Sequence, residues 1–139
     1  MQHETGRAGA LLQIDLQAVR NNYRFLQGKL GAVPCGAAVK ADAYGLGAVP
    51  VSKVLLAEGC RHFFVAHLEE AITLRPHLPE EARIYVMHGS PVGHEAEFIE
   101  HRCIPVLNSV AQIVAWRQLA DARNQTLPAI IQLDTGMAR

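Results

Sequence analysis

The stretch of this sequence with the clearest capacity for chemistry runs from residue 37 to residue 47 and reads AAVKADAYGLG. Lys40 follows a short apolar run and lies close to the expected end of a strand. Desolvation at such a position disfavours the ammonium form, and a neutral amine can condense with a carbonyl group to form a Schiff base. The pattern alone also allows a lysine that simply extends its charge into water. Gly45 and Gly47 would let the backbone approach a phosphate, although the third glycine of a dinucleotide fingerprint is missing.

A second reactive stretch ends the chain and reads LDTGMAR, from Leu133 to Arg139. Arg139 follows a predicted strand, where a guanidinium group can hold a carboxylate through two parallel hydrogen bonds. An isolated arginine near a terminus is also commonly just solvated. The Asp134-Thr135-Gly136 triplet occurs in aspartic proteases as well, whose two carboxylates share a proton. Here the triplet occurs once and only three residues follow it, which disfavours a protease.

The elements that must position these residues alternate along the chain. Short apolar runs predict strands at 35–40, 61–66, 84–87, 104–107 and 129–133, and helical spacing predicts helices at 17–30, 48–58, 68–75, 92–102 and from 109 onward. Asp15 is the expected N-cap of the first helix, and Gly59 is the expected glycine after the second. Ser109 and Gln112 form a capping box that begins the last helix.

Strands that alternate with helices indicate βαβ units around a parallel sheet. The strands recur every ~20–25 residues, a spacing that suits both a (β/α) barrel and a doubly wound sheet, and a complete barrel takes ~250 residues. A chain of 139 residues is therefore too short for a whole barrel. Two interpretations stay open at this point, a small open sheet and the first part of a larger enzyme.

Composition excludes several classes of function. The chain has 13 basic and 13 acidic residues, and 50% of its residues are hydrophobic, which is typical of a globular core and gives no reason to expect nucleic acid as a partner. No apolar stretch is long enough to span a membrane, and no secretory signal precedes residue 10, so we expect a cytoplasmic protein. Cys35, Cys60 and Cys103 have no metal-ligand spacing, which predicts free thiols and no metal site.

Three motifs together resemble the N-terminal part of alanine racemase. They are Gln13–Leu16 followed by two asparagines, Val39–Gly45, and Asp134–Arg139, and they match in order and spacing from about residue 11 to the last residue. The resemblance implies an α/β fold, a partial (β/α) barrel of about five parallel strands with intervening helices. It also implies a flexible N-terminus at 1–10, an incomplete pyridoxal-phosphate-binding barrel at 11–139 and no C-terminal β domain. The chain would then be a fragment, inactive or nearly so alone.

The resemblance also assigns roles to individual residues. It implies that Lys40 binds pyridoxal 5'-phosphate covalently and moves the α-proton on the D face of the substrate. Tyr44 would contact the cofactor phosphate, and Arg139 would bind near the substrate carboxylate. Met87 would line the cofactor ring, although core packing explains it equally well. Gln132 stands where many relatives have a lysine that becomes carbamylated and supports the arginine.

The activity implied is the interconversion of L-alanine and D-alanine, which supplies D-alanine for peptidoglycan. Racemisation needs a second acid or base on the opposite face of the substrate. In the family, which is homodimeric, this is a tyrosine from the C-terminal domain of the partner subunit. The alternative interpretation is a non-catalytic pyridoxal-phosphate-binding barrel, which would share the lysine strand without needing the substrate arginine.

Overall fold

The structure is a computed structural model that describes residues 9–136, and in this part of the chain it has five parallel strands. The elements are α1 (Leu16–Leu30), β1 (Ala37–Ala38), α2 (Lys40–Tyr44), α3 (Ala48–Ala57), β2 (His62–Val65), α4 (Leu68–Leu74), the 3-10 turn η2 (Arg75–His77), β3 (Arg83–Val86), α5 (Glu95–Glu100), β4 (Cys103–Leu107), α6 (Val110–Arg123) and β5 (Ile130–Ile131).

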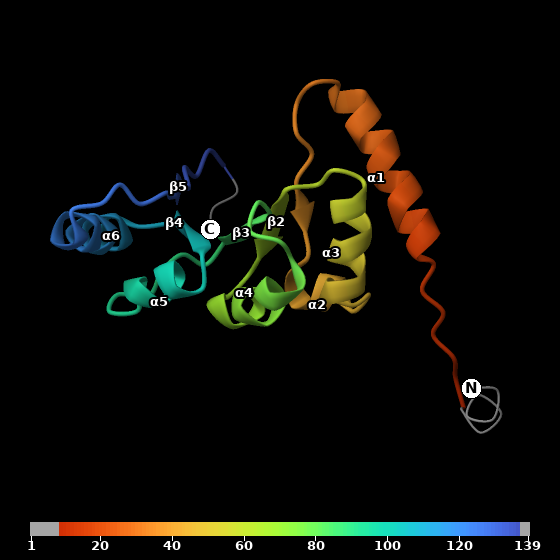
Figure 1. Ribbon diagram of the computed structural model, residues 1–139, viewed down its shortest axis with the longest axis horizontal. Helices are drawn as coiled ribbons and strands as arrows, with labels where there is room; N and C mark the ends of the chain where they lie inside the picture. Colours follow the sequence, from red (N-terminus) through yellow and green to blue (C-terminus); the bar gives the residue numbers. More distant parts are fainter. Residues whose placement is uncertain (1–8, 137–139) are drawn as a thin grey trace.

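The order of strands in space follows their order in the chain, β1-β2-β3-β4-β5, and each neighbouring pair is parallel. Helices α3, α4, α5 and α6 lie along one side of the row of strands (Figure 1). A doubly wound sheet would reverse its strand order and carry helices on both faces. The sequential order therefore confirms the predicted partial (β/α) barrel and excludes the doubly wound alternative.

The core lies between the sheet and these helices. Phe63 in β2 pairs with Ile84 in β3, which pairs with Cys103 in β4, so the three side chains form one row on the helix side. All three are buried. Burial raises the pKa of the Cys103 thiol to about 11. The row shows why the short apolar runs were recognisable as strands, since side chains on this face are covered completely.

The other face of the sheet carries an aromatic cluster. The next row in the register contains Ala38, Phe64 and Tyr85, and the rings of Phe64 and Tyr85 stack with centroids 4.7 Å apart. His62 Nδ1 lies 2.8 Å from the Tyr85 hydroxyl oxygen. A Cβ atom added to Gly36 would lie 3.0 Å from Cε2 of Phe64. The small residues of the β1 segment therefore leave space that the Phe64 ring occupies.

Helix α1 packs along α3, at the β1 end of the sheet (Figure 1). Asp15 Oδ1 accepts hydrogen bonds from the amides of Gln17 and Ala18, which confirms the predicted N-cap. Tyr23 is buried and donates its hydroxyl to the carbonyl oxygen of Cys35 at 2.9 Å. Burial raises the pKa of the Tyr23 hydroxyl, so this tyrosine stays a neutral hydrogen-bond donor.

Buried Arg75 closes the connection between α4 and β3. Its guanidinium donates hydrogen bonds to the carbonyl oxygens of Ala82 at 2.8 Å and Leu78 at 2.9 Å, and also to that of Pro79. Burial lowers the pKa of this arginine from its ordinary value. The predicted helix 68–75 ends one residue early, at Leu74, because the chain tightens there into the 3-10 turn η2, which begins at Arg75 and contains Pro76.

Several predicted boundaries were wrong. Strands β1 and β5 have two residues each and are shorter than the apolar runs that predicted them. Helix α5 begins at Glu95 rather than at Val92, because Gly93 has a φ of 95° and interrupts the helical pattern. Strands β2, β3 and β4 shift by one residue or fewer at each end.

The capping box of the last helix is only half formed. Ser109 Oγ accepts a hydrogen bond from the amide of Gln112 at 3.3 Å, as predicted. The Gln112 side chain, however, does not return to Ser109: its Oε1 accepts from the amide of Asn108, and its Nε2 donates to the carbonyl oxygen of His88. Gln112 therefore ties α6 to the end of β3 instead of completing the box.

Candidate functional site

Lys40 lies at the carboxyl edge of the sheet, where parallel α/β folds bind their ligands. It begins α2 two residues after β1 and directly follows Val39, whose amide continues the β1–β2 pairing by donating to Phe64 O at 2.8 Å. The lysine side chain is half-buried. Its Nζ lies 5.9 Å from the centroid of the Tyr44 ring. The structure thus brings together two of the three predicted site residues, whereas Arg139 lies outside the described residues.

The turn that follows Lys40 is left-handed. The φ angles of Ala41, Asp42, Ala43 and Tyr44 are 51°, 52°, 53° and 56°. This conformation costs an L-residue about 1–2 kcal/mol, and it usually occurs at single residues rather than in runs. A run of four non-glycine residues therefore needs support from outside the turn. Nothing in the residue types of the segment predicted this conformation.

Two carboxylates support the left-handed turn. Asp42 Oδ1 accepts a hydrogen bond at 2.6 Å from the amide of Ala48, the first residue of α3. Glu70 reaches across from α4, and its Oε1 accepts a hydrogen bond at 2.6 Å from the amide of Ala41. Hydrogen bonds to ionised acceptors are about twice as strong as those between neutral groups. Both contacts were missed from the sequence, although Glu70 stands three residues after the N-cap His67, which is where the glutamate of a capping box lies.

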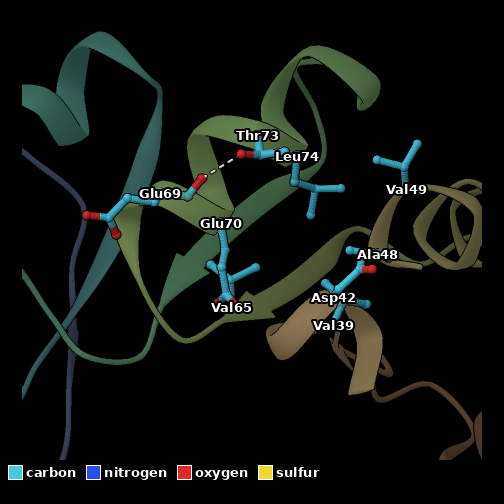
Figure 2. Close-up of a pocket in the computed structure, with 9 residues that line it drawn as sticks. All are labelled: Val39, Asp42, Ala48, Val49, Val65, Glu69, Glu70, Thr73 and Leu74. Carbon is cyan, nitrogen blue, oxygen red and sulfur yellow. Dashed lines mark hydrogen bonds between the residues drawn. The ribbon is translucent and has the colours of Figure 1, made fainter. Parts of the chain in front are cut away.

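A cavity of about 320 Å³ lies behind this turn, between α2, α3 and α4. It is lined by Val39, Asp42, Ala48, Val49, Val65, Glu69, Glu70, Thr73 and Leu74. Figure 2 shows Glu70 extending from α4 toward Val65, whereas Glu69 points away from the cluster around Asp42. Val65 is on the helix side of β2, since Phe64 before it faces the aromatic cluster. The cavity is therefore behind the sheet rather than on the face that carries Phe64 and Tyr85.

Tyr44 and the glycines after it form the outer part of the site. The Tyr44 side chain is 67% exposed, which leaves its hydroxyl accessible to a bound molecule. Gly45 and Gly47 both have positive φ, at 86° and 88°. A Cβ atom on Gly47 would lie 2.8 Å from Cγ of Pro50, so glycine is required there for the start of α3, whereas Gly45 has open space around it.

The other two tyrosines are already engaged within the fold. Tyr23 donates to a backbone carbonyl under α1, and Tyr85 is buried in the aromatic cluster beside His62. Neither tyrosine is at the carboxyl edge beside Lys40. This arrangement agrees with the predicted helix 17–30, which contains Tyr23, and with the predicted strand 84–87, which contains Tyr85.

The carboxyl ends of β3 and β4 are joined by side-chain hydrogen bonds. Asn108 Nδ2 donates to the carbonyl oxygens of Met87 at 2.9 Å and Val106 at 2.8 Å. Met87, which follows β3 directly, is half-buried. Asn108 was not singled out from the sequence. Its contacts give the edge a defined shape across two strands.

Between residues 9 and 136 no helix combines the length and the apolar character needed to cross a lipid bilayer. The same range contains no group of three or more histidine, cysteine, aspartate or glutamate side chains arranged to hold a metal ion.

Comparison with known proteins identifies relatives over nearly the whole chain. Residues 14–139 match the family model described as alanine racemase, N-terminal domain. The catabolic alanine racemase of Rhizobium johnstonii is 50% identical over 132 residues, which cover 95% of this chain and 35% of the relative. The alanine racemase of Brucella abortus is 46% identical over 132 residues, covering 95% of this chain and 33% of the relative.

Solved structures show the same similarity. The alanine racemase of Bartonella henselae, described with covalently bound pyridoxal phosphate, superimposes with a TM-score of 0.88 at 44% identity, over 91% of this chain and 35% of that one. The alanine racemase of Streptomyces coelicolor A3(2) gives a TM-score of 0.82 at 32% identity, over 91% and 34%. The chain thus spans about a third of the length of these relatives. With a family match that extends from residue 14 to residue 139, the chain belongs to the alanine racemase N-terminal domain family.

Proposed function

We propose that this chain provides the cofactor-binding lysine of a pyridoxal-phosphate-dependent alanine racemase. In this proposal the complete enzyme interconverts L-alanine and D-alanine, supplies D-alanine for peptidoglycan, and acts in the cytoplasm as a homodimer. The observation that carries the proposal is the position of Lys40, half-buried at the carboxyl edge of the sheet with its Nζ 5.9 Å from the Tyr44 ring. The relatives are alanine racemases, and one of them is described with the cofactor covalently bound.

The residues at this edge fit the cofactor chemically. An aldehyde needs an amine, which Lys40 offers, and a phosphate needs hydrogen-bond donors in a place that it can reach. The accessible hydroxyl of Tyr44 is such a donor, and the space around Gly45 is open. When bound, pyridoxal phosphate withdraws electrons from the α-carbon of an amino acid, so that the α-proton can be removed.

The side chains then have separate tasks. Lys40 would hold the cofactor through Nζ; once the amino group of alanine had taken its place on the cofactor, the freed neutral amine of Lys40 would accept or return the α-proton on the D face of alanine. Tyr44 donates its hydroxyl to the phosphate, and Arg139 binds the alanine carboxylate through paired hydrogen bonds. Tyr23 and Tyr85 are committed to other partners, which supports a second acid or base from the partner subunit.

Reductive trapping tests the role of Lys40. The chain is incubated with pyridoxal phosphate and reduced with borohydride, and the modified peptides are identified by mass spectrometry. We expect the adduct on Lys40, with little on Lys29 and Lys53, the chain's other lysines, which are both exposed and serve as internal controls. A Lys40→Ala variant should lose the adduct, whereas Lys53→Ala should keep it. Equal labelling of the three lysines would contradict the proposal.

A second measurement separates a racemase from a non-catalytic pyridoxal-phosphate-binding barrel. Proton transfer by Lys40 alone exchanges the α-hydrogen of D-alanine with deuterium from solvent, without any second base. We expect exchange faster than that caused by free pyridoxal phosphate, and expect it to be lost in Lys40→Ala. Cofactor trapping on Lys40 with exchange no faster than that of the free cofactor would favour the non-catalytic alternative.

A further inference from the structure

Glu70 joins two segments that meet at the carboxyl edge of the sheet. Its Oε1 accepts from the amide of Ala41 at 2.6 Å, and its Oε2 accepts from the amides of Ala66 at 2.6 Å and His67 at 3.2 Å. The first of these amides belongs to the turn that carries Lys40, and the other two belong to the loop between β2 and α4. One half-buried side chain thus connects the ends of β1 and β2.

The contact with Ala41 acts on Lys40 directly. The Ala41 nitrogen is part of the peptide group whose carbonyl belongs to Lys40, so a bond to this nitrogen fixes the plane of the lysine's own peptide. The four residues that follow Lys40 have left-handed backbone angles, which are unfavourable without outside support. Without this bond, we expect the turn to relax toward ordinary angles and to move the origin of the lysine side chain.

A carboxylate suits this task because both of its oxygens accept hydrogen bonds. Each glutamate oxygen faces at least one amide donor. A glutamine of the same shape has one acceptor oxygen, and its amino group would face a donor on the other side. The neighbouring Glu69 provides the contrast, since it is exposed and points away from the turn (Figure 2).

We propose that Glu70 is a positioning residue, which fixes the Lys40 turn through the amide of Ala41 and thereby sets the place of the lysine amine at the carboxyl edge. The functional consequence rests on the proposed role of Lys40, whereas the structural part does not. The competing explanation is that Glu70 only caps α4. Capping uses Oε2 and the amides of Ala66 and His67, so it leaves the Ala41 amide without a role.

Hydrogen exchange at single amides distinguishes these explanations without any cofactor. Hydrogen bonds to charged groups contribute about 1.5–3 kcal/mol, so losing one should speed local exchange by about tenfold to a hundredfold. In Glu70→Gln we expect this acceleration at the Ala41 amide, with overall helix content kept. In Glu69→Gln, the matched loss of one carboxylate on the same helix, the Ala41 amide should exchange as in the unsubstituted chain.

The rate of reductive trapping gives the second measurement. In Glu70→Gln the adduct on Lys40 should form about tenfold more slowly, if the turn loses one charge-assisted bond, while labelling of Lys53 stays constant. A variant that is less stable to heat but keeps both the Ala41 exchange rate and the ratio of Lys40 to Lys53 labelling would overturn the proposal. An unsubstituted chain without any Lys40 adduct would instead refute the proposed function, and amide exchange would still test the position of the turn.

The unsubstituted chain provides a test that does not depend on whether a variant folds. A hydrogen bond from the Ala41 nitrogen to the Glu70 carboxylate transmits a scalar coupling between the amide nitrogen and the carboxyl carbon. This coupling is measurable by NMR in an isotope-labelled sample. Its detection supports the positioning role, and its absence beside a detectable coupling from Ala66 would leave Glu70 as a cap of α4 only.

Discussion

Replacing Ala41 by glycine should stabilise the chain, although the same change destabilises ordinary helices. Ala41 is exposed, so its methyl group buries little apolar surface. Its φ of 51° is unfavourable for a residue with a Cβ atom. Relief of the left-handed conformation is worth about 1–2 kcal/mol. The greater freedom of glycine in the unfolded chain offsets about 0.4–1 kcal/mol of this. We therefore expect Ala41→Gly to raise the free energy of unfolding by about 0.5–1 kcal/mol.

The matched control is Ala115→Gly in the middle of α6, a regular right-handed helix. There glycine should lower the free energy of unfolding by about 1 kcal/mol. Urea unfolding followed by circular dichroism measures both changes, and the two variants should shift the midpoint in opposite directions. If Ala41→Gly loses as much stability as Ala115→Gly, the backbone after Lys40 is not left-handed, and the turn needs no support from outside.

Two further predictions concern the buried and exposed charges. Arg75→Met removes the guanidinium donor from three buried backbone carbonyl groups, of which that of Pro79 keeps the amide of Ala82, and should lower the free energy of unfolding by about 3 kcal/mol. Arg117→Met on the surface of α6, whose ion pair is exposed, should change it by less than about 0.5 kcal/mol in the same urea titration. The hydrogen bond from Arg24 lowers the pKa of Glu58, so this carboxylate stabilises the fold above its ordinary pKa of 4.5 and loses that effect as the pH falls. Stability measured between about pH 5 and pH 3 should therefore fall less steeply in Glu58→Gln, and an unchanged slope would contradict the pairing.

The elements that could be predicted from the sequence are those whose signals are local. The alternation of apolar runs with helical spacing predicted all five strands. The runs of β2, β3 and β4 are buried on the helix side of the sheet, whereas the β5 run is largely exposed and was recognisable from its residue types alone. Asp15 and Gly59 were recognisable because capping depends on a few neighbouring residues. Strand ends were less predictable, since the apolar residues of the β1 and β5 runs continue beyond the hydrogen-bonded pairs.

The conformation of the site could not be predicted in the same way. Lys40 and Tyr44 were identified by residue type and by resemblance, and their proximity follows from the turn between them. The left-handed angles of that turn depend on Glu70, which is 29 residues away from Ala41 in the chain. Local propensity contains no information about a contact at that separation, and alanine and tyrosine ordinarily disfavour these angles.

Because Gly36 approaches Phe64 closely, β1 and β2 contribute unequally to the face of the sheet that carries the aromatic cluster. The β1 segment adds little side-chain volume to this face, because the ring that fills the space beside it is that of Phe64 in β2. Replacing Phe64 by a smaller residue would therefore uncover the backbone at Gly36 rather than another large side chain, and the β1 segment would lose the ring against which it packs. A substitution on the second strand could in this way shift the backbone that carries the reactive amine, while every residue of the first strand stays unchanged.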